Sequence, residues 1–168
     1  MEENSKILTK EEAIEKMHRM ALEIAESIED EKSLLFIGIK NSGMVIASKI
    51  AEFLNSYIQI PISIAQLKFD KDDLRISNIQ PEINITDQEI ILVDDVSNSG
   101  RTLLYALKPL LEFLPKKIQT LVMVERMHKI YPVKSDFVGL SIATTKNDYV
   151  KLSIENDEVV GAYIISNN

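Results

Sequence analysis

The chain of 168 residues contains 45% hydrophobic and 27% charged residues, which is typical of a folded protein with one core, so we expect a single domain over residues 1–168. The sequence has no cysteine, which excludes disulfides, thiolate nucleophiles and cysteine-ligated metal sites. A formal net charge of −7 argues against a broad nucleic-acid-binding surface, because neutralising phosphates needs clustered lysine and arginine. No apolar run reaches membrane-spanning length and the N-terminus lacks the apolar core of a signal peptide, so we expect a cytoplasmic protein without a membrane partner.

Apolar residues recur with helical and strand periods along the chain. The predicted elements, in chain order, are a helix from 9 to about 29, a strand over 33–39, a helix over 44–54, strands over 58–66 and 90–96, a helix over 103–114, strands over 118–124 and 137–141, and a hairpin of 150–153 with 159–165. Strands that alternate with helices predict an α/β protein with an open, mostly parallel sheet and helices on both faces.

Local signals refine these elements. Thr9 and Glu12 form a capping-box pattern at the start of the first helix. Pro61 indicates that the strand over 58–66 either lies at an edge or begins there. Residues 68–85 form the longest irregular stretch, which is either a lid over a site or a plain loop. Pro109 is expected to kink or shorten its helix.

The most informative stretch is an apolar strand that ends in Asp94 and Asp95 and opens into a small, polar turn at 98–100. Thr102 then precedes a helix, whose free N–H groups attract an anion. Carboxylates repel phosphate. A ligand that binds both the acidic pair and the turn must therefore carry hydroxyls or a metal beside its phosphate, as a sugar phosphate does. The alternatives are an ordinary strand-to-helix turn, or a receiver-type phosphoacceptor, against which the Gly-Arg-Thr loop argues.

A second candidate phosphate loop follows the strand over 33–39. Gly38 and Gly43 flank it, and Lys40 lies inside it. Backbone N–H groups there could bind phosphate, although a plain loop with a solvated Lys40 is the alternative. Both loops follow strand carboxyl ends, where open parallel sheets bind ligands.

The central stretch resembles the 5-phosphoribosyl 1-pyrophosphate (PRPP) signature of the type I phosphoribosyltransferases. Over most of the chain, the order of segments resembles one branch of that family, the pyrimidine operon attenuator proteins that also have uracil phosphoribosyltransferase activity. The segments that carry the resemblance are Glu12-Ala13-Ile14, Gly38-Ile39-Lys40 with Gly43, Asp72-Asp73-Leu74, Ile85-Thr86-Asp87-Gln88, Val93-Asp94-Asp95-Val96, Gly100-Arg101-Thr102, and Arg126 with His128 and Pro132. The resemblance implies the type I phosphoribosyltransferase fold, in which helices flank a central, mostly parallel sheet, with a small hood and a C-terminal β-hairpin.

The resemblance also implies the reaction, which is transfer of the 5-phosphoribosyl group of PRPP to a nucleobase, such as the pyrimidine uracil, with release of pyrophosphate. Mg²⁺ is the implied cofactor, held by Asp94 and Asp95 mostly through PRPP. The implied catalytic residues are Asp94 and Asp95, which orient the ribose, and Lys40, which holds the leaving pyrophosphate. The other implied PRPP-binding residues are Asn41, Ser42, Gly43, Val96, Ser97, Asn98, Ser99, Gly100, Arg101 and Thr102. The implied base site comprises Arg126, His128, Ile142, Ala143 and Thr144.

The sequence also departs from that branch. Ser42 stands where the branch usually carries an arginine, and the segment 74–85 is shorter than its lid. Asn98 stands where purine-specific relatives place an acidic general base, so we assign it no proton-transfer role. Glu15 and Glu23 occupy polar positions of the first helix, which lacks the basic residues used for RNA, so RNA binding is not expected. A weakly active PRPP- or nucleotide-sensing regulator is therefore the alternative function, and a homodimer or larger homo-oligomer is expected for either.

Overall fold

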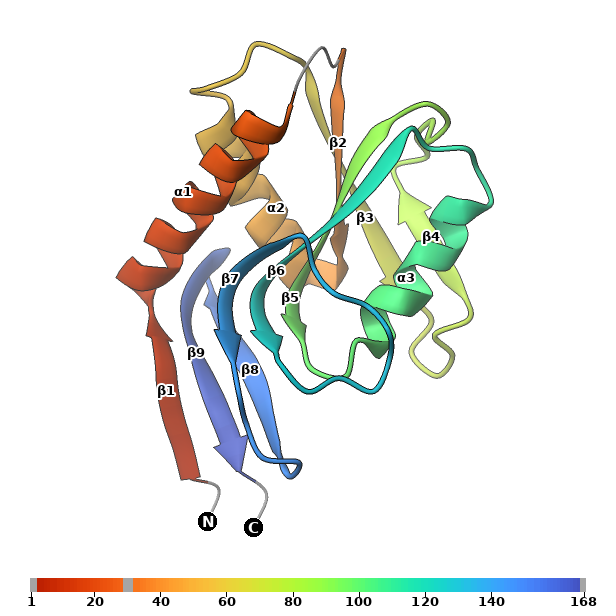
Figure 1. The fold of residues 1–168 in the computed structure, drawn as a ribbon. Helices are drawn as coiled ribbons and strands as arrows, with labels where there is room; N and C mark the ends of the chain where they lie inside the picture. The colour runs from red at the N-terminus through yellow and green to blue at the C-terminus, as the bar shows by residue number, and fades with distance from the viewer. Residues whose placement is uncertain (1–2, 29–31, 167–168) are drawn as a thin grey trace.

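The computed structural model describes residues 3–28 and 32–166 and contains two sheets and three helices in these ranges (Figure 1). The elements are β1 (Glu3–Thr9), α1 (Lys10–Ser27), β2 (Leu34–Ile39), α2 (Lys40–Leu54), β3 (Ile62–Phe69), β4 (Ser77–Gln80), β5 (Glu89–Ser97), α3 (Arg101–Leu111), β6 (Lys117–Arg126), β7 (Phe137–Ile142), β8 (Asp148–Glu155) and β9 (Glu158–Ser166). No helix within the described ranges is long and apolar enough to cross a membrane.

The larger sheet has the strand order β4-β3-β2-β5-β6-β7. Its neighbouring strands pair in parallel, except that β4 is antiparallel to β3 at one edge. The strands β1, β9 and β8 form a separate antiparallel sheet, which lies below α1 in Figure 1. β5 is therefore an interior strand, and its carboxyl end lies beside the carboxyl ends of β2 and β6. The predicted α/β class and mostly parallel sheet are confirmed.

Side chains alternate between the two faces of the larger sheet. In β2, Leu34 and Phe36 pack with α1, α2 and the smaller sheet, whereas Leu35 and Ile37 pack with α3 on the opposite face. Burial on both faces explains why β2 is a continuous apolar run rather than an alternating one.

Two predicted elements have different boundaries in the structure. α2 begins at Lys40 rather than at Met44, so the predicted loop between them is the first helical turn. The strand predicted over 58–66 begins at Ile62, directly after Pro61, whose carbonyl oxygen accepts the Leu34 N–H at 3.0 Å. That strand is not at an edge, because β4 pairs with its outer side.

Two strands were not predicted from the sequence. β4 lies within the stretch 68–85 that was expected to be irregular, and β1 precedes α1. Both are short or polar edge strands, which carry little periodic signal. The N-terminal capping box of α1 is confirmed. The helix ends at Ser27 with Ile28 as its C-cap, slightly before Glu29, which lies outside the described residues. Pro109 lies within the last turn of α3, which ends at Leu111 and is therefore shorter than expected.

Candidate functional site

Asp94 and Asp95 lie at the carboxyl end of β5. Asp94 is 4% exposed, whereas Asp95 is half-buried. The Asp95 N–H donates to Asp94 Oδ1 at 2.9 Å, and the Val96 N–H donates to Asp95 Oδ1 at 2.7 Å. Burial, followed by repulsion from Asp95, raises the pKa of Asp94 well above its ordinary value of 3.8, and Lys40 acts in the opposite direction. The two carboxylates are therefore suited to hydroxyl donors or a cation in a ligand.

The backbone turns sharply between β5 and α3, and we call residues 97–100 the β5–α3 turn. Gly100 has a φ of 83°, a left-handed conformation that favours glycine, and it gives α3 no side-chain cap. Ser99 Oγ accepts the Arg101 N–H at 3.2 Å. Asp94 and residues 96–103 line a cavity of about 80 Å³ at this turn. A helix N-terminus whose N-cap residue has no side chain, beside a small polar cavity, is suited to an anion such as a phosphate.

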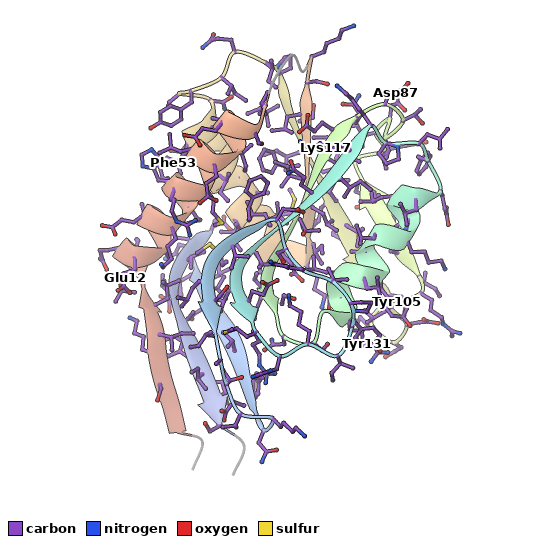
Figure 2. All side chains as sticks on the ribbon, viewed as in Figure 1. Glu12, Phe53, Asp87, Tyr105, Lys117 and Tyr131 are labelled. Atoms are coloured by element: carbon purple, nitrogen blue, oxygen red, sulfur yellow. The ribbon has the colours of Figure 1, made fainter. Side chains whose placement is uncertain are left out.

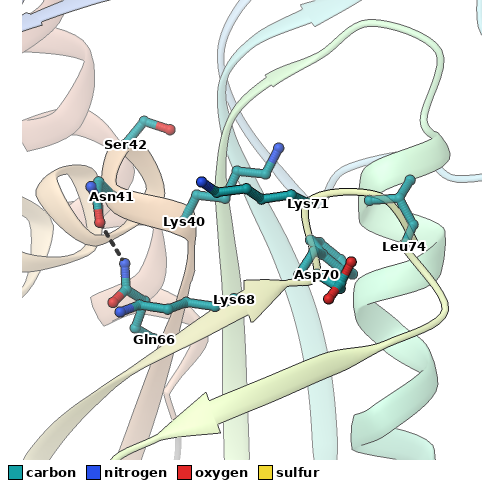
Figure 3. Close-up of a pocket in the computed structure, with 9 residues that line it drawn as sticks. Lys40, Asn41, Ser42, Gln66, Lys68, Asp70, Lys71 and Leu74 are labelled. Carbon is teal, nitrogen blue, oxygen red and sulfur yellow. Dashed lines mark hydrogen bonds between the residues drawn. The ribbon is translucent and has the colours of Figure 1, made fainter.

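A larger cavity of about 630 Å³ lies beside the first turn of α2 (Figure 3). Three lysines line it: Lys40 at the start of α2, Lys68 near the end of β3, and Lys71 in the β3–β4 connection. In Figure 3, Lys40 and Lys71 extend across the cavity from opposite sides, and Lys68 lies along Gln66, whose amide donates to Asn41 Oδ1 at 2.9 Å. None of these lysines forms an ion pair within residues 3–28 and 32–166. Three unpaired cations in an acidic protein indicate a site for a multiply charged anion.

Two glycines hold the start of α2 against the sheet. A Cβ at Gly43 would lie 2.5 Å from Val93 O, and a Cβ at Gly38 would lie 2.6 Å from Met44 N. Lys40 has a φ of 56°, a left-handed conformation that costs a residue other than glycine about 1–3 kcal/mol. These close contacts bring the helix start beside the end of β5, so the lysine cavity adjoins the carboxylates.

Arg126 connects the ends of β6 and β7. Its Nε donates to Thr144 Oγ1 at 2.7 Å, and Arg126 pairs in register with Ile142. Ala143 lies exposed between those two partners. Four of the five predicted base-site residues are therefore neighbours, whereas His128 lies exposed beyond the end of β6, without a hydrogen bond to another residue that the structure describes.

Asn98 joins the β5–α3 turn to the smaller sheet. Its Nδ2 donates to Val150 O at 3.1 Å, and its Oδ1 accepts the Val150 N–H at 3.0 Å. The amide group is thus used to fix the turn against β8, and a contact between this side chain and PRPP stays a prediction.

Sequence reasoning missed Gln66, Lys68 and Lys71, which line the lysine cavity with the predicted Lys40 and Ser42. The predicted strand stopped at Gln66, so Lys68 was assigned to an irregular stretch. The available signal was the position of these residues near a strand carboxyl end, where parallel sheets bind ligands.

A magnesium ion fits the two carboxylates only if a bound ligand supplies the rest of its coordination. In the part of the chain that the structure describes, no group of three or more histidine, aspartate or glutamate side chains could hold a metal. Asp94 and Asp95 supply two carboxylates at most. Mg²⁺ is commonly bound in this way, through one or two carboxylates together with substrate phosphates.

The fold and these cavities agree with the comparison to known families. Residues 3–155 match the phosphoribosyl transferase domain. The chain therefore belongs to the phosphoribosyltransferase family, and by class it is a PRPP-dependent pentosyltransferase. The family and the fold predicted from the sequence are both confirmed.

Similar proteins also support the resemblance to the attenuator branch. The bifunctional protein PyrR of Thermus aquaticus is 32% identical over 149 residues, which cover 83% of this chain and 82% of that protein. The bifunctional protein PyrR of Leuconostoc mesenteroides is 34% identical over 161 residues, which cover 90% and 92%. The hypoxanthine phosphoribosyltransferase of Trypanosoma cruzi shares the fold, with a TM-score of 0.76, 16% identity and coverage of 94% and 95%.

Proposed function

We propose that the protein transfers the 5-phosphoribosyl group of PRPP to a pyrimidine base, with uracil as the first acceptor to test, and releases pyrophosphate. The observation that supports this best is the presence of two anion-suited cavities at one edge of the sheet, with Asp94 lining one and Lys40 lining the other. PRPP has this distribution of charge, with a 5′-phosphate and a 1-pyrophosphate on either side of a ribose that carries hydroxyls. Uracil comes first because the chain resembles the branch with that activity.

In this proposal the β5–α3 turn and Thr102 bind the 5′-phosphate, and Asp94 and Asp95 orient the ribose hydroxyls. Lys40 holds the pyrophosphate, and Lys68 and Lys71 add the positive charge that Ser42 does not supply. The three lysines have no competing carboxylate partner among the described residues, so their charge is available to a ligand.

The reaction forms a bond between a ring nitrogen of the base and the anomeric carbon, and breaks the bond between that carbon and pyrophosphate. The transition state has oxocarbenium character, so the protein contributes mainly position and charge. Mg²⁺, held by Asp94 and Asp95 mostly through PRPP, would neutralise negative charge on the leaving pyrophosphate when bound. The lysines stabilise the negative charge that develops on the leaving group, and the carboxylates of Asp94 and Asp95 favour the positive charge on the sugar.

The base site is proposed at Arg126, Ile142, Ala143 and Thr144, with His128 at its border. The hydrogen bond between Arg126 and Thr144 holds the ends of β6 and β7 together, which is a rigid support for a planar base. A homo-oligomeric state, a cytoplasmic location, one domain over the whole chain and the lack of RNA binding stay predictions from the sequence.

The test is pyrophosphate release from PRPP and Mg²⁺ with uracil, guanine, hypoxanthine, xanthine and orotate offered one at a time. Release that depends on uracil, and that disappears in the Asp94→Asn/Asp95→Asn double variant, is the expected result. Release only when a purine base is offered would show that the acceptor is a purine rather than uracil. Tight PRPP binding without release for any base would favour a sensing regulator, and the absence of PRPP binding would refute the proposed function.

A further inference from the structure

The connection between β6 and β7, residues 127–136, which we call the β6–β7 segment, contacts the β5–α3 turn through the backbone. The Ile130 and Tyr131 N–H groups both donate to Ser99 O at 3.0 Å. A Cβ at Gly100 would lie 3.2 Å from Tyr131 O, so the two backbones are in close contact. The position of the turn therefore depends on the position of this segment.

One buried carboxylate holds the β6–β7 segment from both ends. Glu125 precedes the last residue of β6, and its side chain is 9% exposed. Its Oε1 accepts hydrogen bonds from Lys129 Nζ and, at 3.0 Å, from the Ser135 N–H. Burial raises the pKa of Glu125, but the hydrogen bonds from Lys129 and Ser135 outweigh it and leave the pKa below its ordinary value. The carboxylate is therefore ionised and paired near neutral pH.

The paired lysine is adjacent to the contact with the turn. Lys129 directly precedes Ile130, and its Cδ lies 3.6 Å from the position that a Cβ on Gly100 would take. At the first residue of the segment, the Met127 N–H donates to Ile142 O at 3.0 Å. The ion pair thus lies between the proposed phosphate and base sites without lining either cavity described above.

We propose that Glu125 and Lys129 are positioning residues that hold the β6–β7 segment against Ser99 and so keep the β5–α3 turn in the conformation that binds the 5′-phosphate of PRPP. This inference rests on the proposed function for the identity of the ligand. Neither residue contacts substrate in this assignment; both act through the Ser99 carbonyl group.

Loss of the pair has a defined consequence. Replacing Lys129 leaves a buried carboxylate without its cation, which disfavours the observed arrangement of the segment. The fraction of molecules with a binding-competent turn then falls, and the apparent dissociation constant rises by the inverse of that fraction. Because the turn binds the 5′-phosphate equally in the ground state and the transition state, KM for PRPP rises while kcat is retained.

The experiment compares Lys129→Met with a matched control, Lys117→Met. Lys117 Nζ pairs with the buried Glu89 at 3.1 Å, at the amino ends of β5 and β6 and so away from the β5–α3 turn, and Figure 2 shows Lys117 far from Tyr131. We expect Lys129→Met to raise both the dissociation constant and KM for PRPP roughly tenfold, with kcat within about twofold of the wild type. The control should change none of these by more than about twofold.

Two further variants separate positioning from general damage. Lys129→Arg keeps the charge and should restore PRPP affinity to within about threefold of the wild type. Glu125→Gln combined with Lys129→Met removes both charges and leaves an acceptor for the Ser135 N–H, so the double variant should bind PRPP more tightly than Lys129→Met alone.

Hydrogen exchange of the ligand-free protein gives a readout independent of turnover. Lys129→Met should increase exchange over residues 99–104, and Lys117→Met should not. Wild-type affinity in Lys129→Met, or equal losses in the two lysine variants, would refute the positioning role. If the wild type binds no PRPP, the proposed function fails; unchanged exchange over 99–104 would then refute the positioning role, and increased exchange would support it for the turn alone.

Discussion

The replacement Asp94→Asn is expected to inactivate the enzyme and stabilise the ligand-free fold. Asp94 is 4% exposed and lies beside Asp95, and both burial and this repulsion raise its pKa well above 3.8. A carboxyl group whose pKa is raised by folding stabilises the native state most below its unfolded pKa, and this contribution is lost as the pH rises toward the folded pKa. At neutral pH the Asp94 carboxyl group therefore lowers the free energy of unfolding of the wild-type protein, and asparagine at this position does not.

The magnitude follows from the isosteric nature of the change. Asparagine Oδ1 retains the hydrogen bond that Asp94 accepts from the Asp95 N–H at 2.9 Å, so no existing contact need be lost. Relief of a destabilised active-site residue raises the free energy of unfolding by about 0.5–2 kcal/mol. For a chain of this length, 1 kcal/mol corresponds to roughly 2–4 °C in Tm, so the expected gain is about 1–8 °C.

The assay is thermal unfolding of the ligand-free wild type and variant from about pH 4 to pH 8, together with pyrophosphate release. The difference in Tm should be largest at the alkaline end and disappear at the acidic end, where Asp94 is protonated. Asp95→Asn is the matched control, because it removes the same repulsion from a half-buried position and should gain less. An Asp94→Asn variant that melts at or below the wild type at alkaline pH, or a gain that is independent of pH, would refute the reasoning.

Four further results are expected. Lys68→Met and Lys71→Met should each weaken product inhibition by pyrophosphate about fivefold or more. Each variant should bind the nucleoside monophosphate product within about twofold of the wild-type affinity. Equal losses of affinity for pyrophosphate and for the nucleoside monophosphate would contradict the assignment of these lysines to pyrophosphate. Gly43→Ala should lower the free energy of unfolding by about 1–3 kcal/mol, since its Cβ would lie 2.5 Å from Val93 O, and an unchanged Tm would show that α2 moves away freely. Asn98→Ala should lower the free energy of unfolding in urea by about 1–3 kcal/mol, because it leaves the partly buried N–H and carbonyl groups of Val150 in β8 without their side-chain partner. An unchanged free energy of unfolding would mean that water replaces the amide. The pKa of Glu125 is lowered by folding, so its stabilisation is present above its ordinary value of 4.5 and is lost as the pH falls through the folded pKa; the difference in unfolding free energy between the wild type and Glu125→Gln should shrink over that range, and a constant difference would contradict the ion pair.

Contiguous patterns in the sequence determined the centre of the candidate site. The apolar run, the pair Asp94 and Asp95, the small turn and the following helix are consecutive, so local chemistry alone predicted carboxylates at a strand end beside a helix N-terminus. The capping box at Thr9 and the hairpin of 150–153 with 159–165 were predictable for the same reason, because each depends on residues a few positions apart.

Boundaries set by close packing were not predictable. The sequence between Gly38 and Gly43 has the composition of a phosphate-binding loop, but it forms the first turn of α2 because both glycines admit backbone atoms within contact distance. The edge strands β1 and β4 have weak patterns of their own, and each exists because a neighbouring strand offers unpaired backbone groups.

The partners of the central motif were decided by tertiary structure alone. Lys68 joins Lys40 at one cavity because β3 pairs in parallel with β2, and Glu125 is linked to the β5–α3 turn only through the β6–β7 segment, which contacts Ser99. Periodicity shows which face of a strand is apolar but contains no information about strand order or register. Contacts between elements far apart in the chain follow from order and register, so the sequence by itself predicted the chemistry of one loop, and only the folded sheet assembled the other charged groups around it.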